Sequence, residues 1–282
     1  YEISLGLVGS EMCIRDRSYS DKLVDELVLK SYSAHKKLKK ISINKRAVCM
    51  MAVARILNTE SEKLGKTLTQ EMGKTYKSAV AEIKKSAAGA EHYAITAEDY
   101  MADDIIKTNA LKSYRSYQPI GPILAVMPWN YPVWQVIRFA APAIMAGNTV
   151  LLKHASNVQG CANAIEKCFK DAGFPENIFK NLQIPSNMVS RVIEDNRISG
   201  VAITGSNKAG SDVAKKAGEY LKKTVLELGG NDPYVILDDA DIRKAVNFCV
   251  EGRILNGGQS CISAKRLIVT EKNIDTFTKK IT

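Results

Sequence analysis

The chain has 282 residues, of which 45% are hydrophobic and 25% are charged. This composition is too apolar for a disordered chain, and no apolar run reaches the roughly 20 residues of a membrane span, so we expect a soluble protein of one or two domains with no membrane partner. Six cysteines without a C-x-x-C pair argue against a disulfide framework or zinc ribbon and favour a reducing compartment, for which we predict the cytoplasm. With only three histidines, we predict no metal site.

The net charge of +10 raises the question of an anionic partner. The basic residues are mostly lysines at helical spacing, and no arginine cluster is interleaved with aromatic residues. This pattern favours solvated helix faces over an anion-binding surface, although the second alternative stays open. We predict no nucleic-acid partner.

The amino end, YEISLGLVGSEMCIRDR, lacks the basic segment, apolar run and cleavage site of a signal peptide. Residues 7–16 resemble the translation of a transposase sequencing adapter, so we expect residues 1–17 to be a non-native leader. At the other end the sequence stops at Thr282 inside an amphipathic pattern without a helix stop signal. We therefore expect a piece of a longer gene product.

The first half of the chain reads as helical. From Ser20 to Gly73 the apolar residues recur at intervals of three and four, which predicts two amphipathic helices, and Thr75 to Tyr100 predicts a third. A polar stretch follows, in which tyrosines alternate with polar residues near 114–118. We predict an exposed extended ribbon there.

Beyond residue 122 the pattern changes to short β-rich apolar runs that alternate with helical stretches. Such alternation predicts βαβ units and a mostly parallel sheet, and hence an α/β fold. The glycine pair after residue 228 is the one candidate domain boundary, which gives domains at 18–228 and 229–282. The predicted strands are Ile123–Met127, Thr149–Leu152, Gly200–Ile203, Thr224–Leu228 and Tyr234–Leu237, and the predicted helices are Val133–Met145, Val158–Ala172 and Ala209–Tyr220.

The stretch most informative for function is Asn256-Gly-Gly-Gln-Ser-Cys261. A cysteine after a Gly-Gly turn and before an expected helical run can lie where backbone N–H groups point at its sulfur and favour the thiolate. We therefore predict that Cys261 is reactive. The other cysteines beyond the leader lie in helical patterns and are expected to be buried small hydrophobic residues: Cys49, Cys161, Cys168 and Cys249.

Two polar residues upstream are further candidates. Glu227 lies in an otherwise apolar strand, where a buried carboxylate without a partner would suit a general base; a salt-bridged structural glutamate is an equal alternative. Asn130 lies in Met-Pro-Trp-Asn-Tyr-Pro, where two prolines fix the backbone. Its amide can donate to an oxyanion or cap a turn, and this motif alone favours neither.

The chain contains no G-x-G-x-x-G and no G-x-x-x-x-G-K-[ST] phosphate motif. Instead, Thr204-Gly-Ser-Asn-Lys-Ala-Gly210 follows a predicted strand and opens a predicted helix. Helix N-termini after glycine-containing turns bind phosphate through free N–H groups. By spacing alone this indication is weak.

Four motifs in order, W-N-x-P, G-S-x-x-x-G, E-L-G-G and G-Q-x-C, resemble the aldehyde dehydrogenase superfamily over about residues 20–282. MPWNYPVWQVIR, LLKHASNVQGCA and VLELGGNDPYVILDDAD are most similar to succinate-semialdehyde dehydrogenases. The resemblance implies a Rossmann-like NAD(P)-binding domain over 18–228 and the start of a truncated α/β catalytic domain over 229–282. It also implies an oligomerisation ribbon near 103–118 and a parent enzyme that is a homodimer or homotetramer.

The resemblance also implies roles for single residues. Cys261 would be the nucleophile, Glu227 the general base, and Asn130 the side-chain half of an oxyanion hole that the Cys261 N–H completes. The cofactor would be NAD or NADP, and Arg138 would bind a small aldehyde substrate. The residues implied in cofactor binding are Lys153 at the ribose (counted also as catalytic), Gly205 and Ser206 at the pyrophosphate, Trp129 in the channel, Leu228 at the nicotinamide, and Asn130, His154, Ala155 and Ser156.

The chain departs from the family pattern at four positions. Ser156 stands where NAD-preferring members often carry Glu, and a serine there admits the 2′-phosphate of NADP. Leu255 replaces the second of two arginines that hold a semialdehyde carboxylate, Ser263 stands where some relatives have a redox cysteine, and Asn207 replaces a frequent threonine. The resemblance implies succinic semialdehyde or a similar small aldehyde as the substrate, and these departures leave the choice among such aldehydes open.

The implied reaction oxidises the aldehyde to a carboxylic acid through a thiohemiacetal and a thioester on Cys261, which water activated by Glu227 hydrolyses. An alternative is a noncatalytic truncated fragment, for which we expect no sustained turnover. A third hypothesis is a cysteine hydrolase that uses Cys261 without a cofactor; cofactor-free turnover of a thioester or ester would distinguish it.

Overall fold

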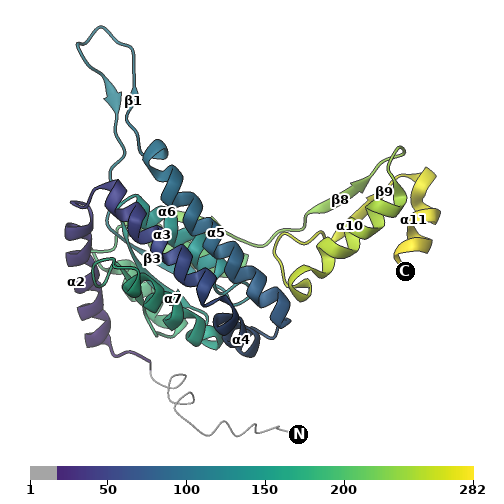
Figure 1. Ribbon diagram of the computed structural model, residues 1–282, viewed down its shortest axis with the longest axis horizontal. Helices are drawn as coiled ribbons and strands as arrows, with labels where there is room; N and C mark the ends of the chain where they lie inside the picture. The colour runs from purple at the N-terminus through teal and green to yellow at the C-terminus, as the bar shows by residue number, and fades with distance from the viewer. Residues whose placement is uncertain (1–17) are drawn as a thin grey trace, which may run out of the picture. The chain divides into compact units, whose positions relative to one another are not determined.

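The computed structural model describes residues 18–282, and the predicted leader lies outside them. The described chain divides into two compact units (Figure 1). The first unit ends at Glu227, and the second is Leu228–Thr282.

The described part of the first unit opens with four helices: α2 (Asp21–Leu38), α3 (Ile43–Thr59), α4 (Ser61–Met72) and α5 (Tyr76–Tyr100). Three of them begin at a hydroxyl that accepts a hydrogen bond from a backbone N–H three residues later. The prediction of two helices before Gly73 is wrong, because α3 and α4 are separate. The chain turns between them at Glu60, without the glycine or proline that marks a helix end in a sequence.

A five-stranded parallel sheet forms the centre of the first unit, in the order β5-β4-β3-β6-β7. The predicted α/β fold with a parallel sheet is confirmed. β5 and α8 were not predicted, because segments of three and six residues are too short for a periodic pattern. The strands are β3 (Pro122–Met127), β4 (Thr149–His154), β5 (Phe179–Asn181), β6 (Gly200–Thr204) and β7 (Lys223–Glu227), and the helices between them are α6 (Trp134–Met145), α7 (Gln159–Asp171), α8 (Val189–Glu194) and α9 (Asn207–Glu219).

Helices cover both faces of this sheet. Neighbouring residues of a strand point to opposite faces, so each strand supplies apolar side chains to a core on either side. Leu152 of β4 belongs to the core formed with α3, α5, α6 and α7. Leu151 belongs to the other core, formed with α2, α8 and α9. The first unit is therefore a three-layer α/β/α structure.

The strand order places a topological switch between β3 and β6. From β3 the chain proceeds to β4 and β5 on one side, and then crosses to β6 and β7 on the other. In open parallel sheets, ligands bind outside the carboxyl ends of the strands at such a point. The loops that follow β3, β4 and β6 meet at this edge.

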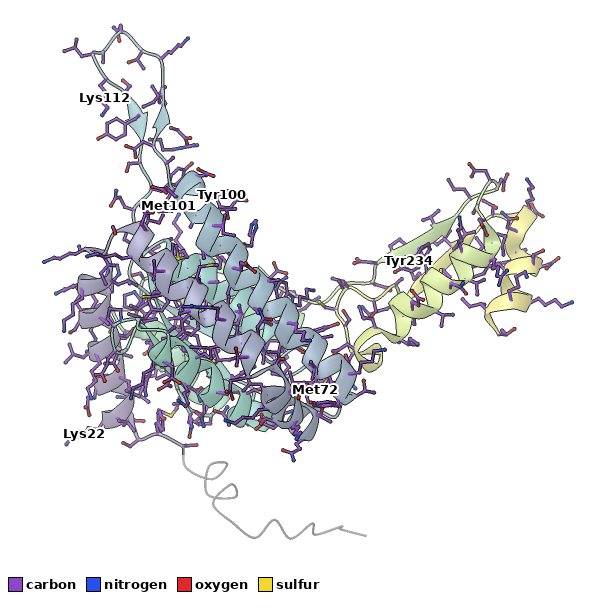
Figure 2. All side chains as sticks on the ribbon, in the orientation of Figure 1. Lys22, Met72, Tyr100, Met101, Lys112 and Tyr234 are labelled. Carbon is purple, nitrogen blue, oxygen red and sulfur yellow. The ribbon has the colours of Figure 1, made fainter. Side chains whose placement is uncertain are left out.

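The predicted exposed ribbon is present. β1 (Asp104–Ile105) pairs antiparallel with β2 (Tyr114–Arg115), and all four residues are exposed. The hydroxyl of Tyr117 donates to Asp104 Oδ2 at 2.9 Å. The ribbon extends from the end of α5, with Lys112 in its connecting loop (Figures 1 and 2).

The second unit pairs β8 (Pro233–Ile236) with β9 (Arg266–Val269) in parallel. α10 (Ile242–Ile254) and α11 (Ile274–Ile281) pack beside them around a small core. The expectation of a helical run directly after the reactive cysteine is wrong: β9 comes next, because Arg-Leu-Ile-Val is a β-forming sequence that pairs with β8.

No helix among residues 18–282 is both long and apolar enough to cross a membrane. The cysteines of this part of the chain are free thiols. Cys161, Cys168 and Cys249 are buried as predicted, whereas Cys49 is only half-buried. In the same residues no three His, Cys, Asp or Glu side chains form a group that could hold a metal ion.

Candidate active site

The loop between β3 and α6 carries Trp129 and Asn130 at the carboxyl edge of the sheet. Trp129 is exposed and Asn130 is half-buried. The buried ring of His154, at the end of β4, bridges the two ends of this loop. Its Nε2 lies 2.9 Å from the Pro132 carbonyl, and its Nδ1 lies 3.1 Å from the Met127 carbonyl.

Burial lowers the pKa of His154 from 6.5 to about 4, so the ring is neutral at pH 7. A neutral ring has one donor and one acceptor. Each ring nitrogen faces a backbone carbonyl, so the neutral ring can donate to one of the two, Pro132 or Met127. The sequence placed His154 among the cofactor contacts; the structure uses its ring inside the protein to hold the loop.

Lys153 points to the opposite face of the sheet from His154. It lies two residues from Leu151 on β4 and therefore shares the face covered by α8 and α9. Its ammonium is largely buried and donates to Ser186 Oγ at 3.3 Å. Burial lowers the pKa of Lys153, and among residues 18–282 no carboxylate lies within salt-bridge distance of it. A buried ammonium bonded to a serine hydroxyl thus lies near the carboxyl ends of the strands.

The turn from β6 into α9 contains Gly205 and Ser206. Ser206 is the N-cap of α9, and its hydroxyl accepts from Ala209 N at 3.2 Å. The thirteen-residue helix directs its positive end toward the same edge. Ser156 follows β4 and is exposed, and Ala155 between them is half-buried.

Glu227 ends β7, one of the two edge strands of the sheet. Its side chain is 56% exposed, and its carboxylate lies 3.5 Å from the guanidinium of Arg138 on α6. The expectation of a buried carboxylate is wrong, because among residues 18–282 β7 pairs with β6 alone and all five of its residues are exposed. Of the two alternatives for Glu227 alone, the structure shows the salt bridge, although an exposed pair of this kind contributes little stability.

Glu227 and Arg138 line a hollow of about 400 Å³ on the α6 side of the sheet. Met127, Phe139 and Val225 supply much of its apolar wall. The structure therefore brings the predicted general base and the predicted substrate arginine together. Leu228, the predicted nicotinamide neighbour, is half-buried and begins the second unit.

Cys261 lies in the second unit after a tight turn. Asn256, Gly257 and Gly258 have φ angles of 60°, 65° and 76°, in the left-handed region. Glycine adopts this region at no steric cost and asparagine tolerates it, which explains the Asn-Gly-Gly sequence. The Asn256 amide donates to the Gln259 carbonyl at 3.4 Å and stabilises the turn.

Cys261 is half-buried, and its carbonyl accepts from Lys265 Nζ at 3.0 Å. The same ammonium donates to the Gly230 carbonyl at 2.7 Å, so Lys265 joins the Gly-Gly segment to the cysteine turn. Ser260 and Ser263 on either side of Cys261 are buried. Sequence reasoning missed Lys265, because an exposed lysine carries no signal of the carbonyls that it binds.

Sequence reasoning also missed Lys74 and Glu82, which form a buried ion pair near the Asn130 loop. A signal was present: Glu82 lies within the apolar stripe of α5, between the buried residues Ala79, Ile83 and Ser86. A carboxylate at a core position requires a partner.

A model of the aldehyde dehydrogenase family matches residues 10–282. The probable succinate-semialdehyde dehydrogenase (NADP(+)) of Synechocystis sp. is 48% identical over 237 residues, 84% of this chain and 52% of that protein. The succinate-semialdehyde dehydrogenase (NADP(+)) of Mycobacterium avium is 45% identical over 265 residues, 93% of this chain and 56% of that protein.

The crystal structure of succinic semialdehyde dehydrogenase from Streptococcus pyogenes in complex with NADP⁺ is similar to the chain with a TM-score of 0.91 at 36% identity. The match covers 94% of this chain and 59% of that one. The chain therefore spans a little over half the length of these relatives. Because the family match extends over nearly all of its residues, the chain belongs to the aldehyde dehydrogenase family.

Proposed function

We propose that the chain supplies the cofactor-binding unit and the nucleophile of an enzyme that oxidises a small aldehyde to a carboxylic acid with NADP⁺. The activity is proposed for the whole protein, since the chain spans little more than half the length of its relatives. The observation that carries the proposal is the buried Lys153 ammonium, which lacks a carboxylate partner among residues 18–282 at the ligand-binding edge of a parallel sheet.

The residues at this edge fit a dinucleotide phosphate. Lys153 and the positive end of α9 share one face of the sheet, where they can bind anionic and hydroxyl groups. Ser156 is exposed and uncharged beside them, so it admits a 2′-phosphate that a glutamate would repel. The relatives from Synechocystis and M. avium are named as NADP(+) enzymes.

The chemistry assigns one task to each polar residue. The Cys261 thiolate forms a bond to the aldehyde carbon while the carbonyl π electrons move to oxygen. The Asn130 amide and the Cys261 N–H donate to that oxyanion. NADP⁺ bound at this edge would supply the hydride acceptor, and the carbon that loses its hydride would stay bonded to Cys261 as a thioester. Glu227 then takes a proton from water, whose oxygen bonds to the thioester carbon as the thiolate leaves.

Arg138 is proposed to bind a carboxylate on the substrate. It lines the hollow beside Glu227, and its present partner is that exposed carboxylate. An acid group on the aldehyde can replace Glu227 in this pair, which would release the glutamate to act on water. This exchange fits an aldehyde of the succinic semialdehyde class.

The proposed homodimer or homotetramer draws support from the ribbon, where Ile105, Ile106 and Leu111 expose apolar side chains. We propose that the ribbon contributes to self-association. The cytoplasmic location predicted from the cysteine content stays a prediction.

The test is Cys261→Ala in the whole protein, with succinic semialdehyde and NADP⁺. We expect loss of NADPH formation with nearly unchanged NADP⁺ binding, because the variant removes only the nucleophile. Cys49→Ala, which changes a half-buried thiol on α3, is the matched control and should keep activity. Undiminished oxidation by Cys261→Ala would contradict the proposal. Ester hydrolysis without cofactor, in an unchanged protein that does not oxidise the aldehyde, would favour a cysteine hydrolase.

A further inference from the structure

The loop that carries Asn130 leads directly into α6, and this helix begins in an unusual way. Its N-cap residue, Val133, provides no side-chain cap. Instead, Glu82 Oε1 on α5 accepts hydrogen bonds from Val133 N at 2.8 Å and from Trp134 N at 2.9 Å. A carboxylate from a helix that is distant in sequence therefore fixes the point at which the Asn130 loop ends.

Lys74 neutralises this carboxylate and also contacts the loop. The side chains of Lys74 and Glu82 are 1% and 2% exposed, and the ammonium donates to Glu82 Oε2. Lys74 Nζ lies 4.6 Å from the centre of the Tyr131 ring, within the range of a cation–π contact. Tyr131 is the neighbour of Asn130, so the ion pair touches the loop at two places.

The energetics favour a positioning role for this pair. A buried ion pair loses about as much free energy by desolvation as it gains by attraction, and well-packed apolar residues often replace it without loss of stability. Burial also lowers the pKa of Lys74, while the charge of Glu82 opposes this shift. Stability alone thus gives little reason for two charges here, whereas the hydrogen bonds to Val133 and Trp134 give a specific one.

A second carboxylate likewise accepts hydrogen bonds from backbone N–H groups at the start of another helix, α7. Glu71 on α4 accepts from Gly160 N at 2.7 Å and from Cys161 N at 2.9 Å, at the start of α7. A Cβ on Gly160 would lie 2.9 Å from Glu71 Oε1, so a larger residue would force the carboxylate to move. α7 follows the segment that contains Lys153.

Glu71, Lys74 and Glu82 lie in or near the turn between α4 and α5. Met72, the last residue of α4, is labelled in Figure 2. Gly73 makes the turn with a φ of 84°. The buried Cys161 thiol also lies near these charges, and its pKa is raised by burial first and then by Glu71.

We infer that Glu82, neutralised by Lys74, is a positioning residue that holds the Asn130 loop in place for oxyanion binding. This inference rests on the proposed function, in which Asn130 is an oxyanion donor. Glu82 acts through the backbone of Val133 and Trp134 and touches neither substrate nor cofactor.

Two double variants separate positioning from stability. Lys74→Met with Glu82→Gln removes both charges but keeps a side-chain oxygen for Val133 N and Trp134 N. Lys74→Met with Glu82→Met removes both charges and that oxygen, at similar side-chain volume. We expect the amide protons of residues 133 and 134 to exchange about tenfold faster in the second variant, the factor that corresponds to one lost hydrogen bond.

Tryptophan fluorescence provides a second readout of the 282-residue chain, because its two tryptophans, Trp129 and Trp134, both lie at this loop. Acrylamide should quench the Glu82→Met double variant more strongly than the Glu82→Gln double variant. Glu91→Gln, an exposed change on the same helix, should match the unchanged chain in both measurements. If the Glu82→Met double variant does not fold, Glu82→Asp, which withdraws the carboxylate by one methylene, should show faster exchange at the same amides.

In the whole protein, the Glu82→Met double variant should have a kcat about 10²-fold below that of the Glu82→Gln double variant, as expected when a catalytic group shifts by about 1 Å. Its Kd for NADP⁺ should be similar. Equal exchange and quenching in the two double variants, or faster exchange with equal kcat, would overturn the inference. The exchange result requires no turnover, so a failure of the proposed function, shown by an active Cys261→Ala variant, is distinguishable from it.

Discussion

The two units differ in how they hold their polar loops. The first unit has a continuous core on each face of its sheet, and its loops are fixed by buried side chains such as Glu82 and His154. The second unit has a core of four buried hydrophobic residues, and the exposed Ile262 follows Cys261 directly. Its cysteine turn is held by left-handed backbone and by Lys265.

This difference follows from the apolar surface that each unit can bury. A polar side chain can hold a loop from inside the protein only where a core surrounds it and excludes water. A small unit buries a smaller fraction of its surface and has less of such a core. The first unit can therefore fix a loop from the inside, with a side chain that lies 51 residues away in sequence. The second unit relies on conformations that Asn-Gly-Gly adopts locally.

The largest expected effect concerns the glutamate at the end of β7. Glu227→Gln should slow thioester hydrolysis by roughly 10²- to 10⁴-fold, the range for general-base catalysis. Hydride transfer precedes hydrolysis, so a burst of NADPH should survive in rapid-mixing experiments on the whole protein. Glu176→Gln, at an exposed site, is the control. Loss of the burst with NADP⁺ still bound would place Glu227 at an earlier step.

A pair of core substitutions tests the two units directly. In the first unit the rings of Phe169 and Phe179 are stacked, with their centroids 4.7 Å apart. Phe169→Ala should lower the free energy of unfolding by about 3–5 kcal/mol. Phe277→Ala removes one of the buried residues of the second unit. Because both tryptophans belong to the first unit, the urea transition followed by their fluorescence should shift only for Phe169→Ala. Equal shifts would show that the units unfold together.

The parallel sheet was predictable because each of its longer strands is a short apolar run between clear helices. The three helices before Gly73 were not, because the break at Glu60 has no glycine or proline. Glu227 was expected in a buried strand because its neighbours Val225 and Leu226 are apolar. β7 is an edge strand, however, and leaves both of them exposed. Periodicity reports polarity and does not report the position of a strand within its sheet.

The candidate site shows the same limit. Motifs predicted roles for Asn130, Lys153 and Glu227, and these roles remain predictions. The motifs could not identify the pairing of Glu227 with Arg138, or the hydrogen bonds of Glu82 to α6, because partners far apart in sequence depend on the fold. The imidazole of His154 likewise required the structure, since the same sequence is compatible with a ring that faces the cofactor.

The next largest effect is the pH dependence of His154. Its folded pKa of about 4 lies below the ordinary 6.5, so the unfolded chain binds more protons between these values. Stability should therefore fall as the pH drops from about 6.5 towards 4. The loss between pH 7 and pH 5 should be about 2 kcal/mol from this residue, measured by urea unfolding.

His154→Gln should remove this part of the pH dependence, whereas the exposed His92→Gln should leave it unchanged. Burial also lowers the pKa of His35, which adds a contribution of the same sign in all three proteins. An unchanged pH profile in His154→Gln would mean that the ring does not hold the Asn130 loop in its neutral form.

In the proposed enzyme, NADP⁺ binds at the edge of the first unit formed by Lys153, Ser156 and α9. The most direct test titrates the whole protein with NADP⁺ and NAD⁺, before and after Ser156→Glu, with Ser33→Glu on α2 as an exposed control. We expect Ser156→Glu to weaken NADP⁺ binding roughly tenfold more than NAD⁺ binding, as about 1.4 kcal/mol of like-charge repulsion implies. Equal effects on the two nucleotides, or no effect on either, would contradict it.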